Sequence, residues 1–228
     1  MIGVVDSGMG GENTVTEIRR LYPGINILLL KDVKNAPYGT KSECELVRIT
    51  EKNIERLTAL GAETVLLACC TASTVWESLA PQYRERSIPI LPSVADGVRA
   101  LSECGRVALI GTDRTVSSCA FERLLPEMKI FKIAAQRLVS FVEGGERDGH
   151  VSRECREYLE ALLAPLSEIG ADTLILGCTH FPSLYATVSD IAKKYGIKYT
   201  VSSSLAGARA LRRQGALSSS EGGVTVRL

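Results

Sequence analysis

Residues 61–69 read GAETVLLAC, and residues 170–178 read GADTLILGC. The nine positions are identical or similar in the two segments, which align without a gap. In each segment a Gly-Ala pair leads into a short apolar run that ends in a cysteine, a pattern typical of a buried β-strand. A repeat of this kind indicates two duplicated structural units.

A weaker repeat supports the same division of the chain. Residues 3–8 read GVVDSG and residues 108–113 read ALIGTD, so that an apolar run again ends in small and polar residues. We therefore expect two similar α/β halves that face each other. The boundary between them is predicted near Leu91-Pro92-Ser93.

Short apolar runs alternate with longer segments of helical period. The runs predict buried strands at residues 2–5, 25–30, 64–68, 88–91, 107–110, 173–176 and 198–201. The longer segments predict helices at residues 12–21, 42–60, 72–83, 94–103, 116–125, 152–169, 184–195 and 205–214. This alternation is typical of an α/β fold with parallel sheets and right-handed crossovers, in which ligands bind beyond the carboxyl ends of the strands.

Composition excludes several classes of partner. Of the 228 residues 45% are hydrophobic, enough to bury one large core or two small ones. Lys and Arg (27) nearly balance Asp and Glu (26), so neither a nucleic acid nor an anionic membrane surface is expected as a partner. No apolar run reaches the roughly 18 residues of a membrane span. Because the first residues also lack the basic region of a signal peptide, we predict a cytoplasmic protein.

The chain contains seven cysteines and two histidines. An odd number of cysteines without a signal peptide argues against a disulfide framework. A zinc site needs CxxC or Cys/His clusters at short spacing, and the local pair Cys178 and His180 is too small for four ligands. We therefore expect no metal, and most thiols are predicted to be reduced and buried.

Two cysteines, Cys69 and Cys178, end the repeated segments. Each lies where a predicted strand turns into a helix, and free backbone N–H groups and the helix dipole are expected to lower the thiol pKa there. Asp6 ends the first strand and is predicted at the same sheet edge as Cys69, while His180 follows Cys178 closely. Each residue alone is more simply a buried small side chain, a helix cap or a structural histidine. Their combination favours a functional site.

Paired thiols in a cleft suit the inversion of a carbon centre. A proton next to a carboxylate is a very weak acid, and inversion needs a base on one face of the carbon and an acid on the other. One ionised and one neutral thiol can exchange these roles with the direction of the reaction. An adjacent carboxylate and the exclusion of water make such a thiolate more basic.

Six motifs lie in order along about residues 1 to 210. They are VDSGMGG at 5–11, PYG at 37–39, ACCTA at 68–72, GTDRT at 111–115, LVSFVEGG at 138–145 and LGCTHFP at 176–182. At these motifs the sequence resembles the glutamate racemases, within the cofactor-independent aspartate/glutamate racemase superfamily.

The resemblance implies two Rossmann-like domains with parallel sheets, related by pseudo-symmetry, with the active site in the cleft between them. The first domain would comprise residues 1–92 and about 203–228, and the second residues 93–202. The C-terminal segment after about Ser202 would cross back to the first domain.

The resemblance also implies roles for individual residues. Cys69 and Cys178 would be the acid/base residues, with Asp6 assisting Cys69, and with His180 and Glu143 assisting Cys178. The substrate would be surrounded by Ser7, Pro37, Tyr38, Gly39, Cys70, Thr71, Thr112, Thr115 and Thr179.

The sequence departs from the family pattern at several positions. Cys70 stands where the family has a substrate-holding Asn, and the loss of that amide leaves the identity of the substrate open. We expect Cys70 not to be the catalytic base, because its side chain should point into the pocket wall or the following helix. Ser202 replaces an Asp of the family, and the sequence ends at Leu228, before the last helix of longer members.

The implied activity is that of an isomerase that interconverts L- and D-glutamate without a cofactor and supplies D-glutamate for peptidoglycan. Two alternatives stay open: a racemase of aspartate or another amino acid, and a non-catalytic amino-acid-binding protein. The expected partner is a small amino acid. Since family members are often dimers, the resemblance implies a homodimer as well.

Overall fold

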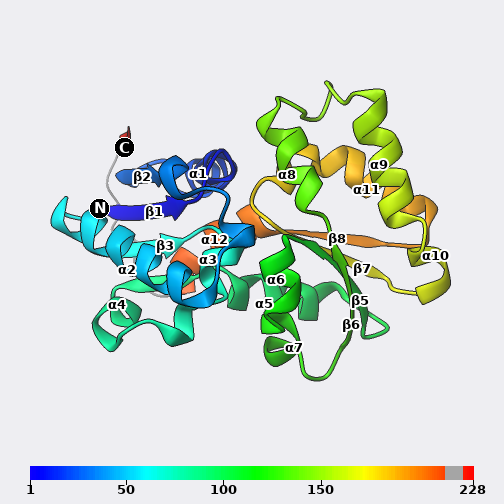
Figure 1. Cartoon of the computed structure of the whole chain (residues 1–228), viewed down its shortest axis with the longest axis horizontal. Helices are drawn as coiled ribbons and strands as arrows, with labels where there is room; N and C mark the ends of the chain where they lie inside the picture. The colour runs from blue at the N-terminus through cyan, green and yellow to red at the C-terminus, as the bar shows by residue number, and fades with distance from the viewer. Residues whose placement is uncertain (214–222) are drawn as a thin grey trace.

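Parallel β-sheets covered by helices form the protein (Figure 1). The computed structural model describes residues 1–213 and 223–228, which contain a five-stranded and a four-stranded sheet. The order of the first sheet is β4-β3-β1-β2-β9, with β1 Ile2–Asp6, β2 Ile27–Lys31, β3 Thr64–Leu67, β4 Ser87–Pro89 and β9 Thr225–Arg227. The order of the second is β6-β5-β7-β8, with β5 Arg106–Gly111, β6 Lys129–Ala134, β7 Thr173–Gly177 and β8 Tyr199–Ser202. The predicted α/β class is confirmed.

The two sheets share one strand order. In both, the first strand of the half pairs with the second on one side and with the third on the other, and the fourth strand lies next to the third. The repeated segments correspond to β3 and β7, and the weaker repeat corresponds to β1 and β5. Sequence repeat and sheet topology therefore agree on which strands are equivalent.

Helices of very different length connect the strands. The α-helices are α1 Gly10–Leu21, α2 Glu43–Ala59, α3 Cys70–Ser73, α4 Pro81–Glu85, α5 Leu91–Leu101, α6 Asp113–Ser117, α7 Ala120–Leu124, α8 Gln136–Glu143, α9 Arg153–Leu163, α10 Leu166–Ile169, α11 Tyr185–Lys194 and α12 Ser203–Arg213. The 3₁₀ turns are η1 Val33–Asn35, η2 Tyr38–Thr40, η3 Trp76–Ser78 and η4 Phe181–Leu184.

Helices cover both faces of the first sheet. Val15 and Ile18 of α1 and Leu211 of α12 belong to the apolar cluster on one face, and Leu46 and Ile54 of α2 belong to the cluster on the other. Burial on both faces explains why these strands read as continuous apolar runs rather than as alternating ones.

The second sheet is covered in the same way. Leu138 of α8, Leu159 of α9 and Val188 of α11 pack on one face, and Val94 of α5 and Phe121 of α7 pack on the other. The second of these clusters also includes Cys70 and Ile90 of the first half, so the buried core continues from one half to the other there.

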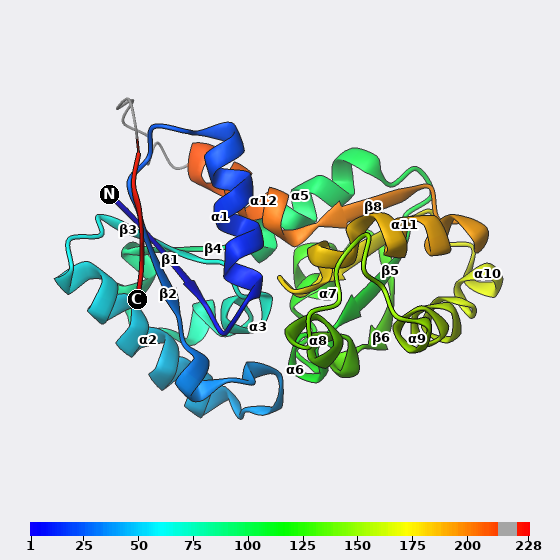
Figure 2. The same cartoon turned by 90° about the horizontal axis from the view of Figure 1, so that it is seen from above.

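The chain returns to the first sheet near its C-terminus. From β8 it enters α12, which lies between α1 and α5 (Figure 2). Further on, β9 pairs in parallel with β2. The predicted domain limits at residues 92 and 203 stay a prediction. Within the part of the chain that the structure describes, no helix is long and apolar enough to span a bilayer.

Several predicted elements differ from the observed ones. The helices predicted at 72–83 and 152–169 are interrupted, with Pro81 and Pro165 each starting a new turn, since proline cannot donate to a continuing helix. The helix predicted at 116–125 is broken at Cys119, which has a left-handed backbone (φ 53°). Strands β6 and β9 were not predicted, because both lack a continuous apolar run. The predicted end at Gln214 lies outside the described residues.

Gly177 offers a test of how tightly the second sheet is packed. It pairs with Gly111 in β5, and a Cβ there would lie 2.6 Å from Leu109 Cδ1 and 3.0 Å from the Ile110 carbonyl oxygen. At Gly111 the nearest atom, on Thr115, is 3.4 Å away. We expect Gly177→Ala to lower the free energy of unfolding by about 1–3 kcal/mol through overpacking, measured by urea denaturation. Gly111→Ala is the matched control and should change it by less than about 1 kcal/mol; equal losses in both variants would contradict this account.

Candidate active site

Buried hydrogen bonds join the carboxyl edges of the two sheets, and one of them involves Asp6. Thr179, just beyond β7, donates from its hydroxyl to Oδ2 of Asp6, the last residue of β1, at 2.8 Å. Both residues are buried. The sheet edges that were predicted to bind a ligand therefore face each other, and the strand-end cysteines Cys69 and Cys178 lie at the same two edges.

Asp6 is completely buried. Its Oδ1 accepts a hydrogen bond from the Gly8 backbone N–H at 3.0 Å, and its Oδ2 accepts the one from Thr179. Burial raises the pKa of Asp6, although the charge of His180 and these hydrogen bonds oppose the rise. The carboxylate is therefore a stronger base than an exposed one.

Cys69 lies between β3 and α3 and is 5% exposed. Its thiol donates to the Ser7 hydroxyl over 3.7 Å. Burial, followed by the negative charge of Asp6, raises the pKa of Cys69 to about 11. The expectation that the helix start lowers this pKa is thus wrong in its net direction. The backbone N–H groups of Ala72 and Thr71 do lower it, but they are outweighed, and α3 has only four residues to contribute a dipole.

Cys178 has a different set of partners. Its sulfur lies 3.5 Å from Nδ1 of His180, and Nε2 of His180 lies 2.6 Å from Oε1 of Glu143. Burial, followed by the electrostatic interaction with the neighbouring Cys70 thiol, raises the pKa of Cys178 well above its usual value. The Glu143 side chain is 43% exposed, so the chain of contacts runs from a buried thiol to a residue in contact with solvent. The backbone N–H of Met9 also donates to Glu143, at 3.2 Å, and ties it to the first half.

Hydroxyl groups from both halves gather beside the cysteines. The hydroxyl oxygens of Thr71 and Thr112 are 2.9 Å apart, those of Thr112 and Thr115 are 2.9 Å apart, and those of Thr71 and Thr115 are 3.3 Å apart. All three residues are buried. Such a cluster can rearrange to hydrogen-bond a polar ligand, because each hydroxyl both donates and accepts.

The Pro37-Tyr38-Gly39 segment reaches the second half through its glycine. A Cβ on Gly39 would lie 2.9 Å from Cβ of Thr112 and even closer to the Gln136 side chain, so this backbone lies directly against the threonine cluster. The Tyr38 ring packs into the core of the first half, and its hydroxyl donates to Asp32 at 2.6 Å. Any contact between Tyr38 and a ligand therefore comes from its backbone.

Sequence reasoning missed the residues that support this segment. Asn53 Nδ2 donates to Asp32 Oδ2 and to the Tyr38 hydroxyl, both at 3.0 Å. Burial raises the pKa of Asp32, but hydrogen bonds from Tyr38, Asn53 and Asn35 outweigh it and leave the pKa lowered. Asp32 directly follows β2, so the rule that functional residues lie at strand ends could have found it.

Cys70 is 1% exposed and packs in the apolar cluster that includes Ile90, Leu91 and Val94. Burial, followed by the charge of Cys69, raises its pKa. These neighbours fit the expectation that its side chain points into the wall rather than acts as the base.

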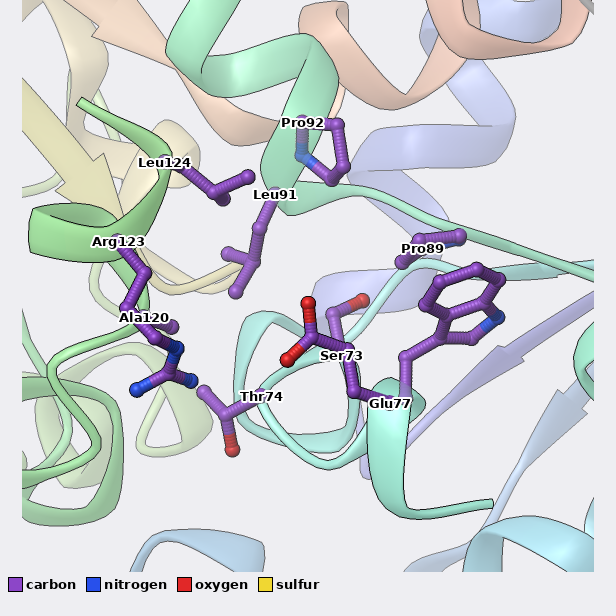
Figure 3. A pocket seen from close by; sticks show the side chains of 10 residues that line it. Ser73, Thr74, Glu77, Pro89, Leu91, Pro92, Ala120, Arg123 and Leu124 are labelled. Atoms are coloured by element: carbon purple, nitrogen blue, oxygen red, sulfur yellow. The ribbon is translucent and has the colours of Figure 1, made fainter. Parts of the chain in front are cut away.

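A separate pocket of about 120 Å³ is lined by residues of α3, α5 and α7 (Figure 3). It is lined by Ser73, Thr74, Trp76, Glu77, Pro89, Leu91, Pro92, Ala120, Arg123 and Leu124. None of the predicted site residues belongs to this lining. The hollow is therefore distinct from the site at the sheet edges, although α3 borders both.

Comparisons with known proteins agree with the fold and the motifs. A family model for Asp/Glu/Hydantoin racemases matches residues 23–210. The glutamate racemase of Desulforudis audaxviator is 40% identical over 192 residues, which cover 80% of this chain and 68% of that protein.

Solved structures give the same result. Glutamate racemase isoform RacE1 from Bacillus anthracis superposes with a TM-score of 0.88 at 26% identity, over 100% of this chain and 87% of that one. Escherichia coli glutamate racemase, in complex with L-glutamate, has a TM-score of 0.74 at 28% identity, over 99% of this chain and 88% of that one. The protein is therefore an amino-acid racemase, which is an isomerase. It belongs to the Asp/Glu/Hydantoin racemase family.

Thiol accessibility gives a direct test of the site. Three cysteines are exposed (Cys44, Cys104 and Cys119) and four are buried (Cys69, Cys70, Cys155 and Cys178). Because reaction with Ellman's reagent requires an accessible thiolate, and burial raises the pKa of all four buried thiols, we expect three thiols to react quickly in the native protein at pH 7. All seven should react in guanidinium chloride. A variant with the three exposed cysteines replaced by serine should lose the fast phase; a fast phase that persists would contradict the assignment.

Proposed function

We propose that this protein interconverts L- and D-glutamate by moving the Cα proton between two thiols, Cys69 and Cys178. The observation that carries the proposal is the pairing of these thiols with their own acid/base partners at facing sheet edges: buried Asp6 near one, and His180 with Glu143 beside the other. The relative from Desulforudis audaxviator and the similar structure from Bacillus anthracis are glutamate racemases, which supports glutamate as the substrate.

The chemistry requires one base and one acid on opposite faces of Cα. By resemblance to the family, Cys178 takes the proton from L-glutamate: the Cα–H bond breaks, an S–H bond forms, and the electron pair delocalises into the α-carboxylate. The Cys69 thiol then gives its proton to the opposite face of Cα. Once D-glutamate has formed, Cys178 is a neutral thiol and Cys69 is a thiolate. The reverse reaction uses the same groups in exchanged roles.

The buried environment makes each thiolate a stronger base. A thiol whose pKa is raised to about 11, as for Cys69, matches the weakly acidic Cα–H better than an exposed thiol does. Asp6 accepts or shares the proton on the Cys69 side. His180 and Glu143 do so on the Cys178 side, where Glu143 provides an exchange route to solvent.

Polar groups around the thiols would hold the substrate. We assign this role to the hydroxyls of Ser7 and Thr179 and of the threonine cluster (Thr71, Thr112 and Thr115), together with the backbone of residues 37–39. Backbone N–H groups at the starts of α3 and α6 are suitable donors to a carboxylate. The amino acid would lie between domain 1–92 plus 203–228 and domain 93–202.

The proposal extends to the biological setting. D-Glutamate is a building block of peptidoglycan, and its supply is the role we assign to this racemase. We propose a cytoplasmic location because the two catalytic thiols must stay reduced, which that compartment favours. A homodimer is proposed from the resemblance alone.

Aspartate or another amino acid is a second candidate substrate. The observation that favours it is Cys70, which stands where the family has an Asn and packs among apolar side chains. A site without that amide holds one fewer fixed hydrogen-bonding group for glutamate.

Serine substitutions test the two-thiol mechanism. An alcohol is scarcely ionised at neutral pH, so Cys69→Ser and Cys178→Ser should each reduce racemisation of glutamate by about three or more orders of magnitude. Both should keep the wild-type circular dichroism spectrum. The measurement is chiral chromatography with no added cofactor, with Cys155→Ser, a buried thiol in the core of the second half, as the control that retains activity.

Wild-type turnover in D₂O completes this test. Deuterium should enter Cα of the product, and little should enter the recovered substrate early in the reaction. Near wild-type racemisation by Cys178→Ser would show that the two-thiol mechanism is wrong. If the wild-type protein racemised aspartate but not glutamate, aspartate would replace glutamate as the proposed substrate.

Cys70→Asn tests how the substrate is chosen. Restoring the amide should leave racemisation intact and raise kcat/KM for glutamate relative to aspartate, by about tenfold if the amide makes one additional hydrogen bond. The measurement is the ratio of the two kcat/KM values in the wild type and the variant. Complete loss of activity in Cys70→Asn, with Cys69→Ser still active, would show that the base had been assigned to the wrong cysteine.

A further inference from the structure

We infer that Asn13 is a positioning residue that aligns the Cys178 turn with the first half of the protein. Asn13 lies in the first turns of α1, and its Nδ2 donates to the Thr179 carbonyl oxygen at 2.8 Å and to the Ser183 hydroxyl at 2.9 Å. Thr179 lies between Cys178 and His180, so Asn13 holds the backbone that carries both side chains. This inference rests on the proposed function of Cys178.

The same threonine is held from a second direction. Its hydroxyl donates to Asp6, while α1 packs directly on it: a Cβ at Gly10 would lie 2.3 Å from Thr179 Oγ1 and 2.6 Å from its Cβ. One bond therefore fixes the side chain of Thr179, the bond from Asn13 fixes its carbonyl group, and the absent Cβ of Gly10 permits the close approach. Together they leave the Cys178 turn little freedom to shift.

An amide is the group that this position requires. Asn13 must donate to two oxygen acceptors, the Thr179 carbonyl and the Ser183 hydroxyl, and the same hydroxyl in turn lies 3.4 Å from Asn13 Oδ1. An ionised Asp of the same shape has no proton to donate and brings a negative oxygen against the carbonyl. Asn13→Asp therefore keeps the size and shape of the side chain but replaces the hydrogen bond to the Thr179 carbonyl group with repulsion between two oxygens.

The consequence falls on one of the two proton transfers. Cys178 reaches the substrate through the turn that Asn13 holds, whereas Cys69 is placed by β3, α3 and its contact with Ser7. Misplacing a reacting group by about 1 Å can cost about a hundredfold in rate. Loss of the Asn13 amide should thus slow proton transfer by Cys178 more than transfer by Cys69, which the Thr179 turn reaches only through Asp6.

Isotope effects can separate the two transfers where rates cannot. Because the two enantiomers have equal free energy, kcat/KM is the same in both directions whichever step is slowed. With Cα-deuterated L-glutamate, Asn13→Asp should show a larger primary isotope effect on kcat/KM than the wild type, since Cys178 removes that deuteron. With Cα-deuterated D-glutamate the effect should become smaller, because removal by Cys69 is then followed by a slower step.

The test compares purified wild type, Asn13→Asp and Asn13→Ala, with Glu43→Gln as the control. Glu43 also bridges the halves, through an ion pair to Arg114 at 2.7 Å, and its other partner is the Ser78 hydroxyl, on the first half. We expect kcat/KM to fall about tenfold or more in both Asn13 variants, with opposite changes of the two isotope effects. Glu43→Gln should keep the wild-type isotope effects whatever its rate.

The outcomes distinguish the inference from the proposed function. Wild-type rates in the Asn13 variants, or a lower rate with both isotope effects unchanged, would overturn the positioning role. The same asymmetry in Glu43→Gln would overturn it too, because any loosening of the halves would then suffice. A wild-type protein that does not racemise glutamate would instead refute the proposed function.

Discussion

The hydrogen bond from Thr179 to Asp6 is the contact on which the rest of the site depends. It joins residues 173 positions apart in the sequence, lies in the buried interior and brings together the carboxyl edges of two separate sheets. Without it Asp6 would be a buried carboxylate held only by backbone donors, which is costly in a medium of low polarity. A single contact between a threonine and an aspartate thus couples the alignment of the halves to the charge state of the site.

Burial governs the electrostatics of this site more than the helix starts do. Every thiol at the sheet edges has a raised pKa, and burial is the leading cause in each case. The two halves surround their thiols with different acid/base groups. Cys69 has a buried carboxylate nearby, while Cys178 contacts an imidazole that leads to a half-exposed carboxylate. The duplicated fold therefore supplies two equivalent thiols, and their neighbours make them chemically distinct.

Much of the fold was predictable because its signals are local. The continuous apolar runs at β1, β3, β5 and β7 follow from burial on both faces of a parallel sheet, and the repeat identified the equivalent strands. Prediction failed where the signal is weak. Strand β6 lies at a sheet edge and consists of exposed and half-buried residues, so it has no continuous apolar run to detect. The helix breaks at Pro81 and Pro165 were marked in the sequence, but helical periodicity continued across them.

The sequence by itself determined the family, the two α/β halves and the candidate residues, from Asp6 and Cys69 to Cys178 and His180, because motifs at strand ends keep their spacing along the chain. Only the tertiary structure decided which of these groups touch. The contact of Asn13 with Thr179 could not be predicted, nor could the outcome at the thiols, where burial and a carboxylate raise the pKa and a helix start lowers it. Both depend on distance and burial between residues far apart in sequence. Periodicity reports which face of an element is buried, but not which residue of the other half lies against it.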